Sequence, residues 1–182
     1  LFLLYLDVID DVSIAIILTV VMLIFGFLFS AVAGYMSGLV GSSNNPVSGV
    51  TIAAILFTSL LLLALVGAGS LKGAASAIMI GAVVCCAAAI AGDNMQDLKA
   101  GRLVGATPWK QQIMQIIGTI TAACVLGLTL DILHSAYTIG SEKLSAPQAT
   151  LMKSIAEGVF KGDLPWNYLI IGAMIGVLII VA

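Results

Sequence analysis

The first residues that could do chemistry lie in the segment 41–49, which reads Gly-Ser-Ser-Asn-Asn-Pro-Val-Ser-Gly and carries no charge. Its amide and hydroxyl groups can donate and accept hydrogen bonds, and its proline has no backbone N–H to donate. Such neutral groups suit a ligand that is itself rich in peptide groups. We predict that Asn44, Asn45, Pro46 and Ser48 contact a substrate. The alternative is an ordinary tight turn, and composition alone does not separate the two.

A second set of candidates follows an apolar stretch, in the segment 92–101. If this segment is helical, Asp93 and Asp97 share a face, and Gln96 and Lys99 lie one turn apart beside them. A carboxylate at a membrane boundary is costly to remove from water and often serves proton or substrate coupling. We predict a coupling or gating role for these four residues. The alternative, which general physics favours, is a solvated helix end whose aspartates pair loosely with Lys99 or Arg102.

The single histidine, His134, follows Asp131 by three residues. One helical turn apart, the two side chains could ligate a metal or relay a proton. Such a pair more often neutralises a helix end at the membrane interface. We therefore expect no metal site and no cofactor.

The elements that position these groups belong to a membrane protein. Of the 182 residues, 61% are hydrophobic and 9% are charged, whereas about 25% of the residues in a soluble domain are charged. Uncharged runs of 60, 20, 20 and 19 residues occupy positions 12–71, 73–92, 111–130 and 164–182. A helix needs about 20 apolar residues to cross a bilayer. The sequence predicts an all-α integral membrane protein, a polytopic bundle of transmembrane helices.

About five spans are expected. The 60-residue run would be about 90 Å long as one helix, so it must break at its only polar, helix-breaking cluster, 41–49. The expected spans cover about residues 12–40, 50–68, 73–92, 111–133 and 166–182, with a polar segment from 93 to 110. Because the chain starts and ends in apolar stretches, we expect residues 1–182 to be one partial transmembrane domain, truncated at both ends.

One amphipathic helix is expected at about 146–161, where apolar and charged residues take opposite faces. Ser145 and Gln148 have the spacing of a capping box, and Gly162 suits a C-terminal cap. Glu157 and Lys161 have the favourable i,i+4 order. This helix should lie on the membrane surface or fold back against the bundle.

Small residues recur at every fourth position of three predicted spans, which places them on one helix face where backbones can approach closely. These residues are Gly26, Ser30, Gly34 and Gly38, then Gly73, Ala77, Gly81, Cys85 and Ala89, then Gly172 and Gly176. The spans should therefore pack against other helices. Seven basic and nine acidic residues give a net charge of −2, which offers no electrostatic basis for nucleic-acid binding.

Three separated segments carry a resemblance. Residues 42–49 read Ser-Ser-Asn-Asn-Pro-Val-Ser-Gly, and residues 92–101 read Gly-Asp-x-x-Gln-Asp-Leu-Lys-x-Gly and run on to Leu-Val-Gly-Ala-Thr-Pro at 103–108. Residues 145–152, Ser-Ala-Pro-Gln-Ala-Thr-Leu-Met, with Gly-Asp-Leu-Pro-Trp at 162–166, form the third. Together these motifs resemble the oligopeptide transporter family, in particular its bacterial members and their plant yellow-stripe-like relatives.

This resemblance implies a secondary transporter in the cell membrane that moves oligopeptides or peptide-like metal chelates, driven by a proton or cation gradient. Family members are far longer, so the expected partners are the substrate, the lipid bilayer and the remaining helices of the same transporter. Two other classes remain open. A structural or channel-type bundle would explain the small-residue stripes but not the two polar motifs. An integral-membrane enzyme would need Asp93, Asp97 and His134 to converge, although the fourth span separates them.

Orientation follows from the basic residues. Lys99, Arg102 and Lys110 are concentrated in 93–110, whereas the acidic turn of Asp7, Asp10 and Asp11 has no basic residue. The positive-inside rule then predicts that 93–110 faces the cytoplasm.

Overall fold

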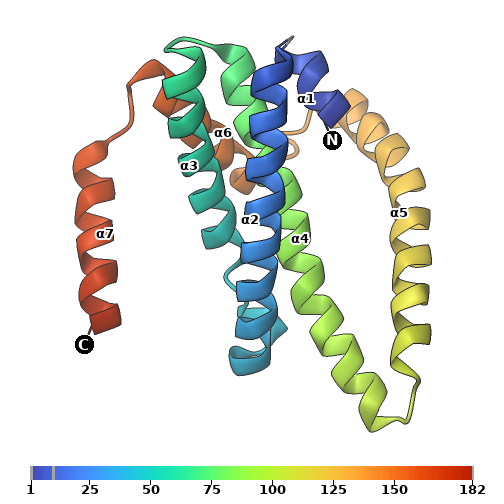
Figure 1. Ribbon diagram of the computed structural model, residues 1–182. Coiled ribbons are helices and arrows are strands. Elements are labelled where there is room, and N and C mark those ends of the chain that lie inside the picture. Colours follow the sequence, from blue (N-terminus) through green and yellow to red (C-terminus); the bar gives the residue numbers. More distant parts are fainter. Residues whose placement is uncertain (1, 10, 182) are drawn as a thin grey trace.

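The computed structural model describes residues 2–9 and 11–181, and in this part of the chain every regular element is helical (Figure 1). The elements are α1 (Phe2–Ile9), α2 (Val12–Val40), the 3₁₀ turn η1 (Ser42–Asn44), α3 (Val47–Val66), α4 (Leu71–Leu103), α5 (Pro108–Tyr137), α6 (Pro147–Lys161) and α7 (Trp166–Val181). Asp10 of the predicted acidic turn lies outside the described residues, and Asp11 caps α2 by accepting from the Ser13 and Ile14 amides. The all-α fold class is confirmed.

Four segments of the described chain are long and apolar enough to cross a membrane: α2, residues 42–66, α4 and α5. The pair α6 and α7, bent by 118° at its break, makes a fifth if it counts as one broken span. Along the chain, α2 descends, α3 returns, α4 descends and α5 rises, so η1 and the loop 104–107 lie at the same end of the bundle (Figure 1). The two polar segments predicted to do chemistry therefore share one end.

Helix α4 is the centre of the bundle, because α2, α3 and α6 all pack against it. Small residues allow this close approach. Gly34 of α2 faces Ala91 and Met95, and Gly81 of α4 receives the Ile55 side chain with no room for a side chain of its own. The fully buried apolar residues of α4 recur along one face: Ala77, Ile80, Val84 and Ala88. The small-residue face predicted in the third span thus meets other helices, whereas in the first span Gly34 does so and Gly26 and Gly38 have no described atom within 4 Å of an added Cβ.

Helix α4 continues well beyond the span expected at 73–92. Its 33 residues would be about 50 Å long, more than the roughly 30 Å of hydrocarbon. The expected polar segment 93–110 is therefore helical as far as Leu103, and only 104–107 form a loop. The reason is local: five of the seven residues at 94–100 are good helix formers, and no proline interrupts 93–107.

Helix α6 folds back against the bundle. Its apolar face, with Ala156, Val159 and Phe160 buried, packs on α3 and α4. The ring of Phe160 lies directly over Gly73, where an added Cβ would come within 2.7 Å, and the Phe160 carbonyl accepts from the Gly69 amide at 3.1 Å. This anchors the amphipathic helix to the turn before α4.

The two ends of α6 test the predicted capping box and the predicted glycine cap. Gly162 takes the left-handed conformation at the C-terminus (φ 76°, ψ 10°), as expected. Glu157 and Lys161 pair at 2.7 Å. The predicted capping box is wrong: Ala146 is the N-cap, no side chain caps the helix, and Pro147 opens it. Proline at the first position removes one of the amides that a cap would satisfy.

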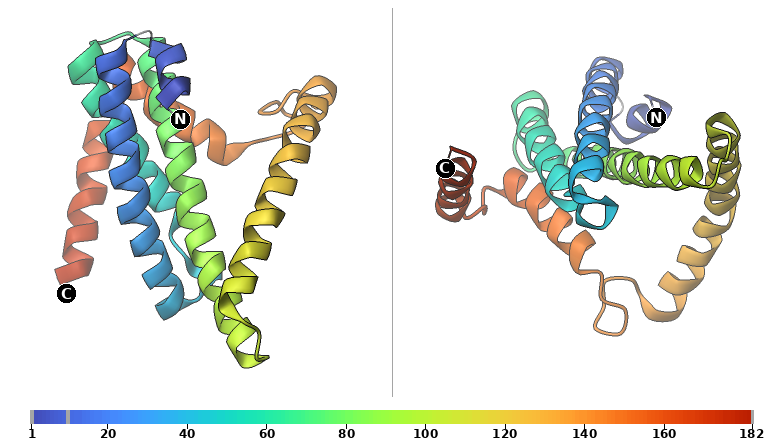
Figure 2. Two further views of the ribbon diagram at one scale, coloured as in Figure 1. Left: turned by 45° about the vertical axis from the view of Figure 1, so that its right-hand side comes forward. Right: turned by 90° about the horizontal axis from the view of Figure 1, so that it is seen from below.

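Helices α5 and α7 stand apart from this core. Figure 2 shows α5 diverging from α4 and α7 lying to the side of the bundle. Neither has a buried residue, and Gly172 and Gly176 have no described atom within 4 Å of an added Cβ. Their apolar faces are suited to lipid or to further helices.

The contact of α2 with α4 can be tested by a disulfide. Cβ atoms at positions 34 and 91 would be 4.0 Å apart, within the roughly 3.5–4.5 Å found across disulfides. In a background free of other cysteines, Gly34→Cys with Ala91→Cys should oxidise to a form that takes up no maleimide before reduction, as measured by intact mass. Gly26→Cys with Ala91→Cys is the control, because nothing lies within 4 Å of a Cβ at Gly26. Two free thiols in both variants would contradict this packing.

Candidate functional site

The two predicted polar segments touch each other. Helix α2 is capped at its C-terminus by Gly41, whose φ of +86° favours glycine, and η1 then turns the chain toward α4. The Ser42 hydroxyl donates a hydrogen bond to Gln96 Oε1. One turn earlier, the buried Ser37 hydroxyl donates to the Gly92 carbonyl at 3.2 Å. The end of α2 and the turn after it are therefore fixed to the motif on α4.

Asn45 packs over Gly92. A Cβ on Gly92 would come within 2.6 Å of Asn45 Nδ2 and 3.7 Å of Ser37 Oγ, so the glycine provides the space that the amide fills. Asn45 Oδ1 is buried and has no hydrogen-bond partner among the described residues. Leaving a buried acceptor unpaired costs about 1–3 kcal/mol, which makes this oxygen a candidate acceptor for a donor from elsewhere.

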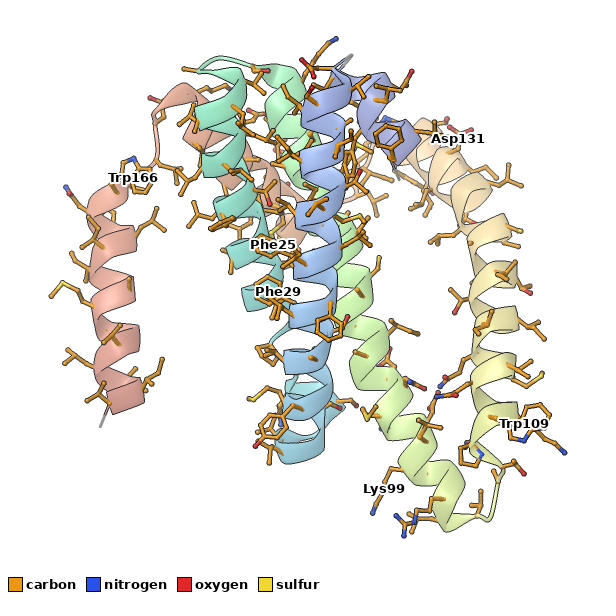
Figure 3. All side chains as sticks on the ribbon, viewed as in Figure 1. Phe25, Phe29, Lys99, Trp109, Asp131 and Trp166 are labelled. Atoms are coloured by element: carbon orange, nitrogen blue, oxygen red, sulfur yellow. The ribbon has the colours of Figure 1, made fainter. Side chains whose placement is uncertain are left out.

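A cavity of about 550 Å³ lies beside this contact, between the end of α2 and the lower part of α4. Its lining residues are Ser37, Gly38, Gly41, Ser42, Met95, Gln96, Lys99, Ala100 and Leu103. Figure 3 shows Lys99 near the lower end of α4. Of the predicted coupling residues, Gln96 and Lys99 face this cavity, and Lys99 is the only charged residue among the described residues that line it.

The four residues predicted to contact substrate do not line this cavity. Asn45 lies behind it against Gly92. Asn44 is exposed and donates to the Val40 carbonyl at 3.2 Å, which satisfies the end of α2. Pro46 and Ser48 are exposed at the start of α3. The polar segment reaches the cavity through Ser42, which composition alone did not distinguish from its neighbours.

Asp97 faces the other side of α4, because consecutive helical residues are rotated by about 100°. Its Oδ2 accepts from Gln115 Nε2 of α5 at 2.7 Å, and its backbone carbonyl accepts from Gln111 Nε2 at 3.2 Å. A second cavity of about 540 Å³ lies here, lined by Asp97, Ala100, Gly101, Val104, Gln111, Met114 and Gln115. Residues of this motif thus line two cavities, and Ala100 lines both.

Within the described part of the chain, no close ion pair joins Asp93 or Asp97 to Lys99 or Arg102. The ion pairs found there join Glu157 to Lys153 and Lys161. Asp93 is exposed at the helix surface, and Asp97 takes an amide donor instead of a cation.

Sequence reasoning missed several polar groups at the α4–α5 contact. Gln111 fits against Gly101 and leaves its Oε1 buried and unpaired, as Asn94 Oδ1 also is. Asn94 lines a third cavity of about 560 Å³ between α2, α4 and α5, together with Ser30, Gln112 and Gln115. The sequence does contain a sign of this polar contact, because three glutamines, at 111, 112 and 115, lie in the first turns of a mostly apolar helix.

Asp131 and His134 lie at the opposite end of α5 from this site (Figure 3). His134 Nδ1 accepts from the Ile139 amide at 3.3 Å and helps to close the helix. Among the described residues no group of three or more His, Cys, Asp or Glu side chains could hold a metal ion. The convergence that a membrane enzyme would need is therefore not formed in the described part of the chain.

Comparisons with known proteins agree with the motifs. The family model described as OPT oligopeptide transporter protein matches residues 2–182. A Haemophilus influenzae protein described as "Putative oligopeptide transporter" is 37% identical over 188 aligned positions, covering 93% of this chain and 30% of that protein. A Saccharomyces cerevisiae protein with the corresponding description is 32% identical over 101 positions, covering 56% of this chain and 14% of that protein.

This chain thus spans less than a third of the length of either relative. No solved structure matches it. The matching family is one of transporters, not of enzymes, which excludes the membrane-enzyme alternative. Its members are multi-pass membrane proteins, in agreement with the apolar helices of the bundle.

The fit of Asn45 over Gly92 predicts energetic coupling between the two positions. Gly92→Ala should displace the Asn45 amide and cost roughly 1 kcal/mol or more from overpacking. That cost should vanish when Asn45 is already alanine, so thermal unfolding of the purified protein should give a non-additive double-mutant cycle. Gly49→Ala, where an added Cβ meets nothing within 4 Å, should add independently to Asn45→Ala. Additive effects at Gly92 would disprove the contact.

Proposed function

This chain belongs to the OPT oligopeptide transporter family, and from that premise we propose that it is part of a secondary transporter of oligopeptides or peptide-like metal chelates, driven by a proton or cation gradient. Within it, residues 42–48 and 92–103 form one mouth of the substrate pathway. The observation that supports this is the Ser42–Gln96 hydrogen bond, which joins two motifs 54 residues apart beside a cavity of about 550 Å³.

The groups around this cavity suit a peptide. Ser37, Ser42 and Gln96 are neutral, so they can be held at the edge of the hydrocarbon without the cost of desolvating an ion. Backbone amides and carbonyls of a substrate need such matched donors and acceptors. Asn44, Asn45, Pro46 and Ser48 then shape the turn that carries Ser42, with Asn45 as the residue that positions it against Gly92.

The depth of the site follows from the length of α4. The uncharged stretch 73–92 is long enough to cross the hydrocarbon, so Gly92 and Gln96 lie near one boundary. Irregular backbone is tolerated there when it faces protein or a cavity. A site at this depth acts at entry or exit, which agrees with the gating role inferred for 92–101.

Asp97 is the proposed coupling residue, with Asp93 in a secondary role. As a carboxylate, Asp97 accepts from the Gln115 amide; once protonated it gains an O–H donor and loses its charge, so the charge-assisted bond between α4 and α5 is weakened. Because α5 contacts α4 only weakly elsewhere in the described chain, a change at this bond can alter how the two helices meet. Protonation and helix movement are thereby linked.

The substrate proposal is tested at Ser42. In the full-length transporter reconstituted in liposomes, Ser42→Ala should raise the apparent KM for peptide uptake about 2- to 12-fold, the equivalent of roughly 0.5–1.5 kcal/mol for a neutral hydrogen bond. Ser43→Ala is the matched control, because Ser43 is exposed and does not line the cavity. Equal KM values in both variants, at equal protein levels, would show that the substrate does not bind beside Ser42.

The coupling proposal is tested at Asp97. Asp97→Asn keeps the size of the side chain and can still accept from Gln115, but it cannot take up a proton. Gradient-driven uptake should fall, while exchange of substrate without a gradient should persist. Asp93→Asn should have the smaller effect, since Asp97 and not Asp93 accepts a hydrogen bond from α5. An unchanged dependence of Asp97→Asn uptake on the gradient would exclude this role.

A further inference from the structure

The charge of the α4 motif is divided between its two cavities. Lys99 is the only charged residue lining the cavity beside Ser42, and within the described chain no carboxylate lies within ion-pair distance of it. Asp97 lines the other cavity and is held there by Gln115. One cavity therefore carries a cation and no anion, whereas the other carries an anion and no cation.

The hydrogen bonds around the cavity that Lys99 lines leave more free donors than free acceptors facing it. The Ser42 hydroxyl donates to Gln96 Oε1, so the acceptor end of that amide is engaged and its two N–H donors remain for another group. The Ser37 hydroxyl donates its hydrogen bond to the Gly92 carbonyl and so has no donor left for a ligand. An ammonium group carries three donors and no acceptor. The groups offered to a ligand at this point are therefore the Lys99 ammonium and the Gln96 amide N–H groups.

We propose that Lys99, together with Gln96, recognises a carboxylate of the substrate, so that this mouth of the transporter selects substrates with a free carboxylate. An ionised carboxylate is an acceptor only, which complements this set of donors, and charge-assisted bonds of this kind are about twice as strong as neutral ones. This inference rests on the proposed function, because it names the substrate chemistry of the same cavity. Two sources fit that chemistry: the C-terminus of a peptide and a carboxylate of a metal chelate.

The test compares a tripeptide with its C-terminal amide, which differ only in the carboxylate. The full-length transporter in liposomes takes up each form under an imposed gradient, and an iron(III) aminocarboxylate chelate serves as a third substrate. Wild type should prefer the free acid. Lys99→Gln should raise the KM for the acid about tenfold or more and leave the KM for the amide unchanged. Lys99→Arg, which keeps the charge, should retain the preference.

Lys110→Gln is the matched control, because Lys110 lies over the Trp109 ring at 5.7 Å and does not line the cavity. Loss of chelate uptake in Lys99→Gln, with peptide uptake unaffected, would assign the carboxylate to the chelate. Equal effects of Lys99→Gln on acid and amide, with chelate uptake unchanged, would overturn the inference while leaving the transporter assignment intact. A wild-type protein that takes up none of the three substrates would instead contradict the proposed function.

Discussion

The packing of α2 and α3 onto α4 is the constraint on which the rest of the structure depends. Lipid is as apolar as leucine, so helices in a membrane gain little from the hydrophobic effect and must associate through close packing and hydrogen bonds. Gly34 and Gly81 supply the close approach, and the Ser37 hydroxyl supplies a buried bond to the Gly92 carbonyl. Because α2 is held this near, the turn that follows it has to meet α4 at Gly92 and Gln96.

Much of the fold could be predicted because hydropathy and helix breakers act locally. The breaks near 41–49 and 67–70, the amphipathic helix and its Gly162 cap all follow from short stretches of sequence. The orientation of each side chain could not, since it depends on which neighbour a helix packs against. Asn44 and Ser42 are equally polar, but only packing decides that Ser42 faces Gln96 while Asn44 bonds to Val40. For the same reason Gln96 and Asp97, adjacent in sequence, serve different cavities.

Two helices of the described chain, and the contact of α4 with α5, present surfaces without partners. Helices α5 and α7 have no buried residue in the described chain, yet α5 opens with three glutamines, and Asn94 and Gln111 leave buried oxygens unpaired beside it. Lipid cannot satisfy such groups. The wedge between α4 and α5 therefore suits a group that can donate hydrogen bonds better than it suits lipid acyl chains.

The position of the motif on a single rigid helix explains how two events could be linked without a chain of intermediate contacts. Gln96 and Asp97 are consecutive residues of α4, bonded to Ser42 on one side and to Gln115 on the other. A helix does not deform within one turn, so a tilt or rotation that strengthens one bond changes the geometry of the other. Coupling requires a structural element with two arrangements, and a group whose protonation or binding state shifts the equilibrium between them. In the proposed function, Asp97 is that group: protonation removes its charge and adds an O–H donor, and the adjacent residue Gln96 accepts from Ser42.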